Sequence, residues 1–357
     1  MNTSQELLSE FIRCQPVTRD LDAVNAATAL LKNYLEEHQL YVELERFRGR
    51  DVLFASTTEK KRPEILFNAH LDVVPAEEPD AFEPKTENGW LYARGAADCL
   101  GNSAVIAAVL TRVRETADAG AVFSTDEEAG GQTTREMVEK GYTANKMICV
   151  MDGKGYALTI AQKGVLTLTL RASGTSCHAA EPWHGTNALD NLIEGYVNIK
   201  KLFGQATADD QWQDTMAAVE CRSGGVHNKV PDEAVMTVNI RYTERGQYER
   251  ILKRIQEVSG LTPEVQMHSE PVVFDENTAI LQNLRGCMEK RLGRNIPMQK
   301  MNGATDARHF AQCGVPVAIL GIPGTDEHGE HEAAELTGMK GYEDILVDFL
   351  EAYSSQD

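Results

Sequence analysis

Histidine and acidic residues recur in this chain in a pattern typical of metal-dependent enzymes. His70 and Asp72 directly follow the apolar run Ile65-Leu66-Phe67. Imidazole and carboxylate groups together suit a divalent transition metal, and zinc is the commonest choice. The series of metal-type residues continues with Asp98, Glu127, Glu128, Asp152 and His331.

These groups outnumber the ligands of one four-coordinate zinc ion. A pair of cations that share one carboxylate would use all of them, and such pairs serve hydrolysis by an activated water. Taken singly, each residue has an ordinary structural explanation: a core histidine at 70, a helix cap at 98, and polar turns at 127–128, 152 and 325–332. Only the combination predicts a metal-dependent hydrolase.

Length and composition limit the class of protein. The 357 residues exceed one typical domain and fit two, and 42% of them are hydrophobic, which is enough for a sizeable core. The formal net charge of -19 argues against a nucleic-acid or anionic-membrane partner, because either requires a basic surface.

The cysteines and the N-terminal segment predict a location. Seven cysteines are scattered without a CxxC pair, which is typical of a reducing compartment. The first residues, MNTSQELLSEFIRCQPV, have no cationic segment followed by a long apolar one, and no apolar run approaches membrane-spanning length. We therefore expect a soluble cytoplasmic protein.

Hydrophobic periodicity predicts an α/β fold. Apolar residues at helical spacing alternate with short apolar runs, which indicates a mostly parallel sheet flanked by helices. The main elements are helices at 4–14, 20–38, 102–114 and 278–292, and strands at 64–69, 121–125, 146–151 and 315–320. Most candidate ligands follow these strands, and in such sheets sites form outside the carboxyl ends of the strands.

A different pattern begins near Gln162. Residues 165–173 and 234–242 alternate polar and apolar side chains, as in a sheet with one solvated face, and helical patterns follow at 188–202 and 247–259. We expect a small α+β unit at 163–272. It is inserted into a metal-binding domain formed by residues 1–162 and 273–357.

In these segments the chain resembles the M20 family of co-catalytic zinc metallopeptidases and deacylases, whose catalytic domain has a di-zinc exopeptidase-like fold. The matching segments cover nearly the whole chain in the family's order. They are Asn68–Pro75, Ala93–Asp98, Thr125–Gly131, Gly174–Ala180, Gly185–Ala188, Asn228–Pro231, and His331 with Glu335 four residues later.

The resemblance implies a role for each candidate. His70 and Asp152 would bind one cation, Glu128 and His331 the other, and Asp98 would bridge the two. Asp72 would hold the far nitrogen of His70 and set its tautomer. Glu127 would be the general base, which takes a proton from the bridging water and later returns it to the leaving amine. The implied cofactors are two divalent ions, zinc first, with cobalt or manganese as alternatives.

The inserted unit resembles the family's lid and dimerisation domain, which implies a homodimer. His178 would stabilise the oxyanion there. Asn228, Arg241 and Arg308 would bind substrate, and Arg308 is suited to grip a carboxylate with two donors. Simpler explanations stay open, namely a surface charge on a strand for Arg241 and a capped turn for His178. The implied substrate is a small peptide or an N-acyl amino acid.

The chain departs from the family pattern in three places. Cys99-Leu100-Gly101 stands where Met-Lys-Gly is usual, and Asp152 stands where many members have Glu, which favours a peptidase. His328 competes with His331 as the last ligand. We favour His331, because Glu335 follows it at the family's spacing.

Two other functions are compatible with the sequence. A non-catalytic relative would bind metal or ligand without turnover, but it would be expected to lose Glu127. A two-metal phosphoesterase would need basic residues for phosphate near the ligands, and the sequence has no obvious cluster of them.

Overall fold

The computed structural model describes residues 3–354, which form two compact units. The larger unit contains residues 3–160, 274–299 and 305–354, and the smaller unit contains 161–273 together with 300–304. The sequence placed the inserted unit at 163–272, and the structure adds the short segment 300–304 to it. Each unit has its own cluster of buried apolar side chains.

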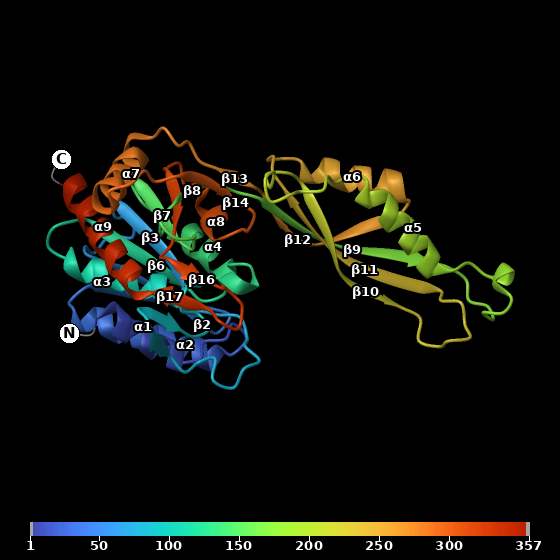
Figure 1. The fold of residues 1–357 in the computed structure, drawn as a ribbon, viewed down its shortest axis with the longest axis horizontal. Helices are drawn as coiled ribbons and strands as arrows, with labels where there is room; N and C mark the ends of the chain where they lie inside the picture. Colours follow the sequence, from blue (N-terminus) through green and yellow to red (C-terminus); the bar gives the residue numbers. More distant parts are fainter. Residues whose placement is uncertain (1–2, 355–357) are drawn as a thin grey trace. The chain divides into compact units, whose positions relative to one another are not determined.

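Most residues of a mixed sheet belong to the larger unit (Figure 1). Its strands lie in the order β1 (Tyr41–Phe47), β2 (Arg50–Ser56), β6 (Ala119–Ser124), β3 (Ile65–His70), β7 (Met147–Met151), β15 (Val317–Leu320), β8 (Leu158–Gln162) and β13 (Val272–Val273), and β14 (Met298–Met301) pairs with β8. The pairings of β6 with β3, β3 with β7 and β7 with β15 are parallel. The strands on either side pair antiparallel, so the parallel part is the centre of the sheet.

Burial explains why the central strands were predictable. Every residue of β3, β6 and β7 is buried, and a strand covered on both faces is expected to be a continuous apolar run. Because β3 and β7 run parallel, their carboxyl ends lie at the same edge of the sheet. His70 is the last residue of β3, and Met151 is the last residue of β7.

Helices cover this sheet. They are α1 (Ser4–Arg13), α2 (Leu21–Glu37), α3 (Leu100–Arg112), α4 (Gln132–Glu139), α7 (Ala279–Leu292), the short α8 (Ala307–Phe310) and α9 (Leu336–Ser354). Helix α3 packs against β3 and β6 and also against α1 and α9, and it is buried along most of its length. A capping box starts α1, in which Thr3 Oγ1 accepts from the Glu6 amide and Glu6 Oε2 accepts from the Thr3 amide.

A small antiparallel sheet lies beside the main one in the larger unit. Its order is β16 (Gly324–Thr325), β17 (Ala333–Glu335), β5 (Trp90–Tyr92) and β4 (Lys85–Glu87). The pairing of β17 with β5 joins two chain segments more than 200 residues apart. It therefore brings the segment before Asp98 next to the loop that contains His328 and His331.

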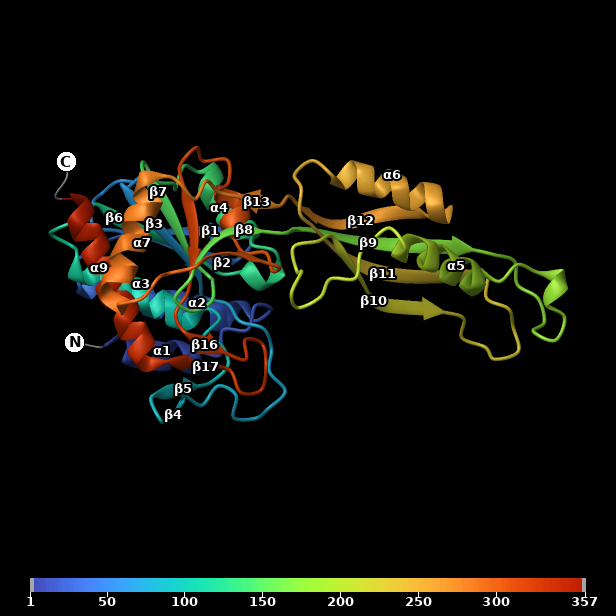
Figure 2. The ribbon, with the colours of Figure 1, turned by 45° about the horizontal axis from the view of Figure 1, so that its top comes forward.

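The smaller unit is a four-stranded antiparallel sheet with helices on one face (Figure 2). The strands lie in the order β10 (Thr215–Ser223), β11 (Glu233–Tyr242), β9 (Gly164–Ser173) and β12 (Thr262–Ser269), and the helices are α5 (Ala188–Lys200) and α6 (Tyr248–Ser259). Alternate residues of β11 are buried, as the sequence predicted. A short 3-10 helix, Pro182–His184, precedes α5, and another, Glu127–Ala129, follows β6.

The helices of residues 3–354 do not resemble membrane-spanning segments. Among residues 3–354, none of the helices combines the length and the hydropathy that crossing a membrane requires.

Candidate metal centre

The first group of candidate ligands gathers at the carboxyl ends of β3 and β7. His70 Nε2 lies 3.0 Å from Asp98 Oδ1 and 3.9 Å from Asp152 Oδ1. The Sγ of Cys99 belongs to the same group, in which the ligand atoms all lie within 4.8 Å of one another. Asp98 and Cys99 are joined by a cis peptide bond directly before α3.

The second group contains Asp98, Glu128 and His328. His328 Nε2 lies 2.9 Å from Glu128 Oε1 and 3.2 Å from Asp98 Oδ2. The two oxygens of Asp98 therefore face different histidines, with Oδ1 toward His70 and Oδ2 toward His328. This is the arrangement in which one carboxylate can bridge two cations.

His331, the ligand that the sequence favoured, lies outside both groups. It is exposed, and its backbone amide donates to Asp326 Oδ2 over 2.8 Å. The structure brings His328 to the acidic groups in its place. The argument that a glutamate follows the histidine ligand by four positions does not discriminate here. Glu332 follows His328 by four positions, just as Glu335 follows His331.

Contacts of Glu332 hold the loop that contains His328 close to Asp98. This buried carboxylate accepts the backbone amides of Ala97 and Asp98 through Oε1, both over 3.0 Å, and forms a 2.7 Å ion pair with Arg94 through Oε2. Arg94 also donates to the carbonyl of His328 over 3.0 Å. The loop with His328 is thereby held against the segment that ends at Asp98.

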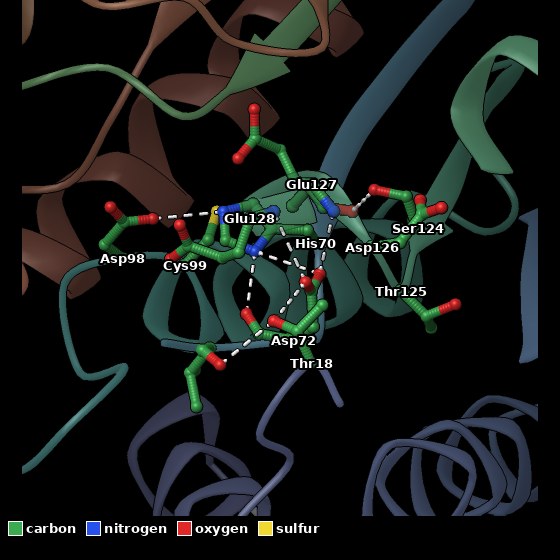
Figure 3. A network of polar contacts seen from close by, with 12 residues as sticks. Thr18, His70, Asp72, Asp98, Cys99, Ser124, Thr125, Asp126, Glu127 and Glu128 are labelled. Carbon is green, nitrogen blue, oxygen red and sulfur yellow. Dashed lines mark hydrogen bonds and ion pairs between the residues drawn. The ribbon is translucent and has the colours of Figure 1, made fainter. Parts of the chain in front are cut away.

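Asp72 organises the other side of the site (Figure 3). His70 Nδ1 lies 2.8 Å from the Asp72 carbonyl and 3.5 Å from its carboxylate Oδ1, so the backbone oxygen is the closer partner. The carboxylate accepts the amides of Glu127 and Glu128 over 3.1 and 3.3 Å, and the Thr18 hydroxyl over 2.8 Å. Asp72 thus directs His70 Nε2 toward Asp98 and also anchors the two glutamates.

Glu127 lies next to Arg308. The Nη2 of Arg308 is 3.6 Å from Glu127 Oε1 and also 3.6 Å from Asp306 Oδ1, and the side chains of all three residues are largely buried. The other oxygen of Asp306 accepts the hydroxyls of Ser124 and Thr134, whereas its Oδ1 has no hydrogen-bond partner.

Positive charge compensates the carboxylates of the site unequally. Burial opposes ionisation of Asp98, but hydrogen bonds to His328 and His70 outweigh it and hold the pKa of Asp98 below its ordinary value. Burial, and after it the charge of Asp306, raises the pKa of Glu127 to about 8. Burial and the charge of Asp98 raise the pKa of Asp152 well above its ordinary value. Hydrogen bonds to Asp98 and Glu128 raise the pKa of His328 to about 10. A site that holds acidic protons and draws a positive charge between Asp98 and Glu128 fits the binding of cations.

The smaller unit contains three further predicted residues. His178 and Asn228 lie side by side. The Ala179 amide donates to the Asn228 carbonyl over 2.9 Å, and the backbones of His178 and Lys229 form an isolated antiparallel β-bridge. Both side chains are exposed. Arg241 pairs with Val165 at the other end of the sheet and donates to Asn239 over 3.0 Å.

The separation between these residues can be estimated from the register. Ser173, five residues before His178, pairs with Glu233, and Val165 pairs with Arg241. Eight residues of strand lie between these pairs, or about 26 Å at a rise of about 3.3 Å per residue. Within one chain, Arg241 and His178 therefore cannot contact the same small substrate.

Two residues of the site had no assigned role in the sequence analysis. Cys99 was noted only as a departure from the family pattern. Glu332 was passed over because Glu335 occupied the place assigned to it. The signals were present, since Cys99 directly follows Asp98 and Glu332 follows the competing His328 at the same spacing.

Comparisons with known proteins show the family of the chain. The sequence profile of the peptidase family M20/M25/M40 matches residues 66–352. Succinyl-diaminopimelate desuccinylase 2 of Ruegeria sp. (strain TM1040) is 27% identical over 381 aligned positions, which cover 96% of this chain and 94% of the relative. The succinyl-diaminopimelate desuccinylase of Marinobacter nauticus is 26% identical, over 98% of this chain and 99% of the relative.

Solved structures match along the whole length. An M20 family metallo-carboxypeptidase from Sulfolobus solfataricus superposes with a TM-score of 0.84 at 15% identity, covering 99% of this chain and 100% of that one. A tripeptidase from Staphylococcus aureus gives 0.81 at 17% identity, with complete coverage of both chains. The profile match covers most of the sequence, and the chain belongs to the peptidase family M20/M25/M40.

Proposed function

We propose that this protein hydrolyses an amide bond in a small peptide or an N-acyl amino acid, with Glu127 as the general base. The observation that carries the proposal is the pair of ligand groups that share Asp98, one with His70 and Asp152 and the other with Glu128 and His328. Glu127 is next to Glu128 in the chain, and the backbone amides of both residues donate to the carboxylate of Asp72.

The ligand set supports two divalent cations. Each group combines one histidine with carboxylates, which suits zinc, and cobalt and manganese are the alternatives to test. When bound, such a pair would lower the pKa of the attacking water and polarise the carbonyl of the scissile amide.

The protein's own groups would manage the proton. Glu127 would accept a proton from the attacking water at a carboxylate oxygen and then donate it to the nitrogen of the leaving amine. Glu128 would be committed as a ligand, so the neighbouring glutamate would be the free base.

Arg308 supports a substrate with a free carboxylate. Its guanidinium lies beside Glu127, and such a group can donate two parallel hydrogen bonds to a carboxylate. Relatives and structural neighbours are named a desuccinylase, a carboxypeptidase and a tripeptidase.

The test is a screen of the metal-loaded protein. Dipeptides and tripeptides are compared with N-acetyl and N-succinyl amino acids, and turnover should vanish on chelation and return with added metal. Glu127→Gln should lower kcat by at least about 100-fold, the scale of general acid-base catalysis. Glu330→Gln, at an exposed position of the His328 loop, is the matched control and should behave like the wild type. Full turnover by Glu127→Gln would refute the role of Glu127.

A homodimer through the smaller unit is part of the proposal. Strand β10 is an edge strand, and apolar side chains are exposed on it and on α5, with Val219, Ile193 and Val197 at 60%, 47% and 46%. A second copy could extend the sheet across a two-fold axis and cover these residues. His178 and Asn228 would then act on the partner's substrate, away from Arg241 of their own chain. Sedimentation of Ile193→Glu should show a monomer if this is correct.

The expected cytoplasmic location stays a prediction from the cysteine pattern. All seven cysteines are free in the structure, which is compatible with it.

A further inference from the structure

Cys99 occupies a position among the candidate metal ligands that the proposed function does not use. Its Sγ lies within 4.8 Å of the ligand atoms of His70, Asp98 and Asp152, and the side chain is completely buried. In Figure 3 the sulfur lies beside the imidazole of His70. The thiol donates to the carbonyl of Met151 over 2.9 Å.

These contacts fix the sulfur at the end of β7. Met151 is the last residue of that strand, and the next residue is the candidate ligand Asp152. Asp98 precedes Cys99 in the chain, and the sulfur belongs to the same group as the carboxylates of Asp98 and Asp152, which are expected to hold one cation. His70 is held in place by Asp72 on the opposite side of its ring.

The spacing is compatible with coordination. In a tetrahedral zinc site with a sulfur at about 2.3 Å and nitrogen or oxygen at about 2.0 Å, neighbouring ligand atoms are roughly 3.3–3.6 Å apart. The observed separations of 4.8 Å or less are therefore within about 1.5 Å of those in a closed site.

We propose that Cys99 is a further ligand of the cation held by His70, Asp98 and Asp152. On coordination, the sulfur-hydrogen bond breaks, the proton passes to solvent, and a sulfur-metal bond replaces the hydrogen bond to Met151. A thiolate favours soft or borderline cations such as zinc, cobalt and cadmium over manganese and magnesium, which prefer oxygen ligands. The inference rests on the metal centre of the proposed function, and it adds to that function a preference for thiophilic cations.

A second buried cysteine provides a matched control. Cys149 is also completely buried and lies on β7, two residues before Met151, but it belongs to neither ligand group found among residues 3–354. If Cys99 only fills space, replacing either cysteine by alanine should have the same small effect. If Cys99 binds the metal, only its own replacement should change the metal site.

The experiment is absorption spectroscopy of the full-length protein, stripped by chelation and reloaded with cobalt(II). The wild type and Cys149→Ala should show a near-ultraviolet thiolate-to-cobalt charge-transfer band, and Cys99→Ala should lack it. Zinc affinity, measured by competition with a chromophoric chelator, should fall at least about tenfold in Cys99→Ala, since even outer-shell partners contribute about 10- to 100-fold. Manganese affinity should change much less.

A measurement on the wild type alone avoids dependence on a folded variant. X-ray absorption at the zinc edge should show a sulfur neighbour at about 2.3 Å. The inference is overturned if that neighbour is absent, or if the cobalt band is missing from the wild type or persists in Cys99→Ala. Hydrolysis without a sulfur ligand would refute this inference and leave the proposed function standing. A sulfur ligand in a protein that hydrolyses none of the amides would do the reverse.

Discussion

At the scale of single residues, the loop from Thr325 to Glu332 presents two histidines, of which one contacts the acidic groups. His328 is 2.9 Å from Glu128, whereas His331 is exposed and only its backbone is engaged. We expect His328→Asn to lose metal and to lower kcat/KM by at least about 100-fold, because a lost ligand weakens both affinity and the activation of water. His331→Asn should retain both. Metal content after dialysis and initial rates distinguish the two variants, and equal losses in both would contradict the assignment.

The sequence does not determine which of these two histidines is the metal ligand. The residue types of the site came from the sequence pattern. The expectation that His70 and Asp98 bind the same cation came from the family resemblance. The choice between His328 and His331 followed from neither, because two overlapping pairs have the same spacing. Only the burial of Glu332 against Arg94 and the amides before Cys99 separates the pairs, and burial of one glutamate in a polar loop is not visible in a sequence.

A second prediction concerns His309, which adjoins Asp306 and Arg308. Burial, and after it the charge of Arg308, lowers the pKa of His309 to about 3. The folded protein therefore binds fewer protons here than the unfolded chain, whose histidine pKa is about 6.5. The stability contributed by neutral His309 is present above pH 6.5 and is lost as the pH falls toward 3, by about 2 kcal/mol between pH 7 and pH 5.

Urea unfolding at pH 7 and pH 5 tests this. His309→Asn should reduce the loss of unfolding free energy between the two pH values by about that amount. His227→Asn, the same change at an exposed histidine, should leave it as in the wild type. An unchanged pH dependence in His309→Asn would show that the pKa of His309 is not lowered in the folded protein.

At the scale of elements, the turn between β6 and α4 determines where Glu127 and Glu128 lie. It ends in Gly130 and Gly131, both with positive φ, and a Cβ on Gly131 would lie 1.8 Å from Asp306 Oδ1. Gly131→Ala should therefore destabilise the protein by about 3 kcal/mol or more, from the left-handed backbone together with displacement of a buried carboxylate.

Gly141→Ala is the control for this turn. Its φ is +92°, but no atom lies within 4 Å of an added Cβ, so only the backbone cost of about 1–2 kcal/mol applies. Urea denaturation of both variants gives the comparison. Equal destabilisation would mean that Asp306 moves aside at no cost.

The predictability of elements followed their burial. Strands β3, β6 and β7 were recognised because both faces are covered and most of their residues are apolar. Strands β10 and β12 lie at the edges of their sheet with mostly exposed residues, so their side chains carry no alternation. The strands of the small sheet contain two or three residues, which is too few to show a pattern in the sequence. Two of the three pairings are between strands that are close in sequence, and the pairing of β17 with β5 joins distant segments.

At the scale of the whole molecule, the two units have separate cores, and both ligand groups lie in the larger one. Metal binding should therefore stabilise the larger unit, by about 2.7 kcal/mol at a free concentration of 100 times Kd. Hydrogen exchange followed by mass spectrometry should show about 100-fold slower exchange in β3 and β7 and little change in β9 and β11. Equal slowing in both units would indicate that they unfold together.

The inserted unit was predicted as a single segment because its pattern of alternation begins and ends within 163–272. The segment 300–304 escaped that prediction, since five residues are too few to show a pattern and their place depends on pairing elsewhere. The chain consequently passes between the units four times instead of twice.

The shared carboxylate of Asp98 has a thermodynamic consequence. One oxygen serves the group with His70 and the other serves the group with His328. If each group binds a cation, negative charge drawn toward one cation is less available to the other, so the two sites are coupled through the Asp98 carboxylate. By linkage, the factor by which a cation at the first site changes the affinity of the second site equals the factor by which a cation at the second site changes the affinity of the first.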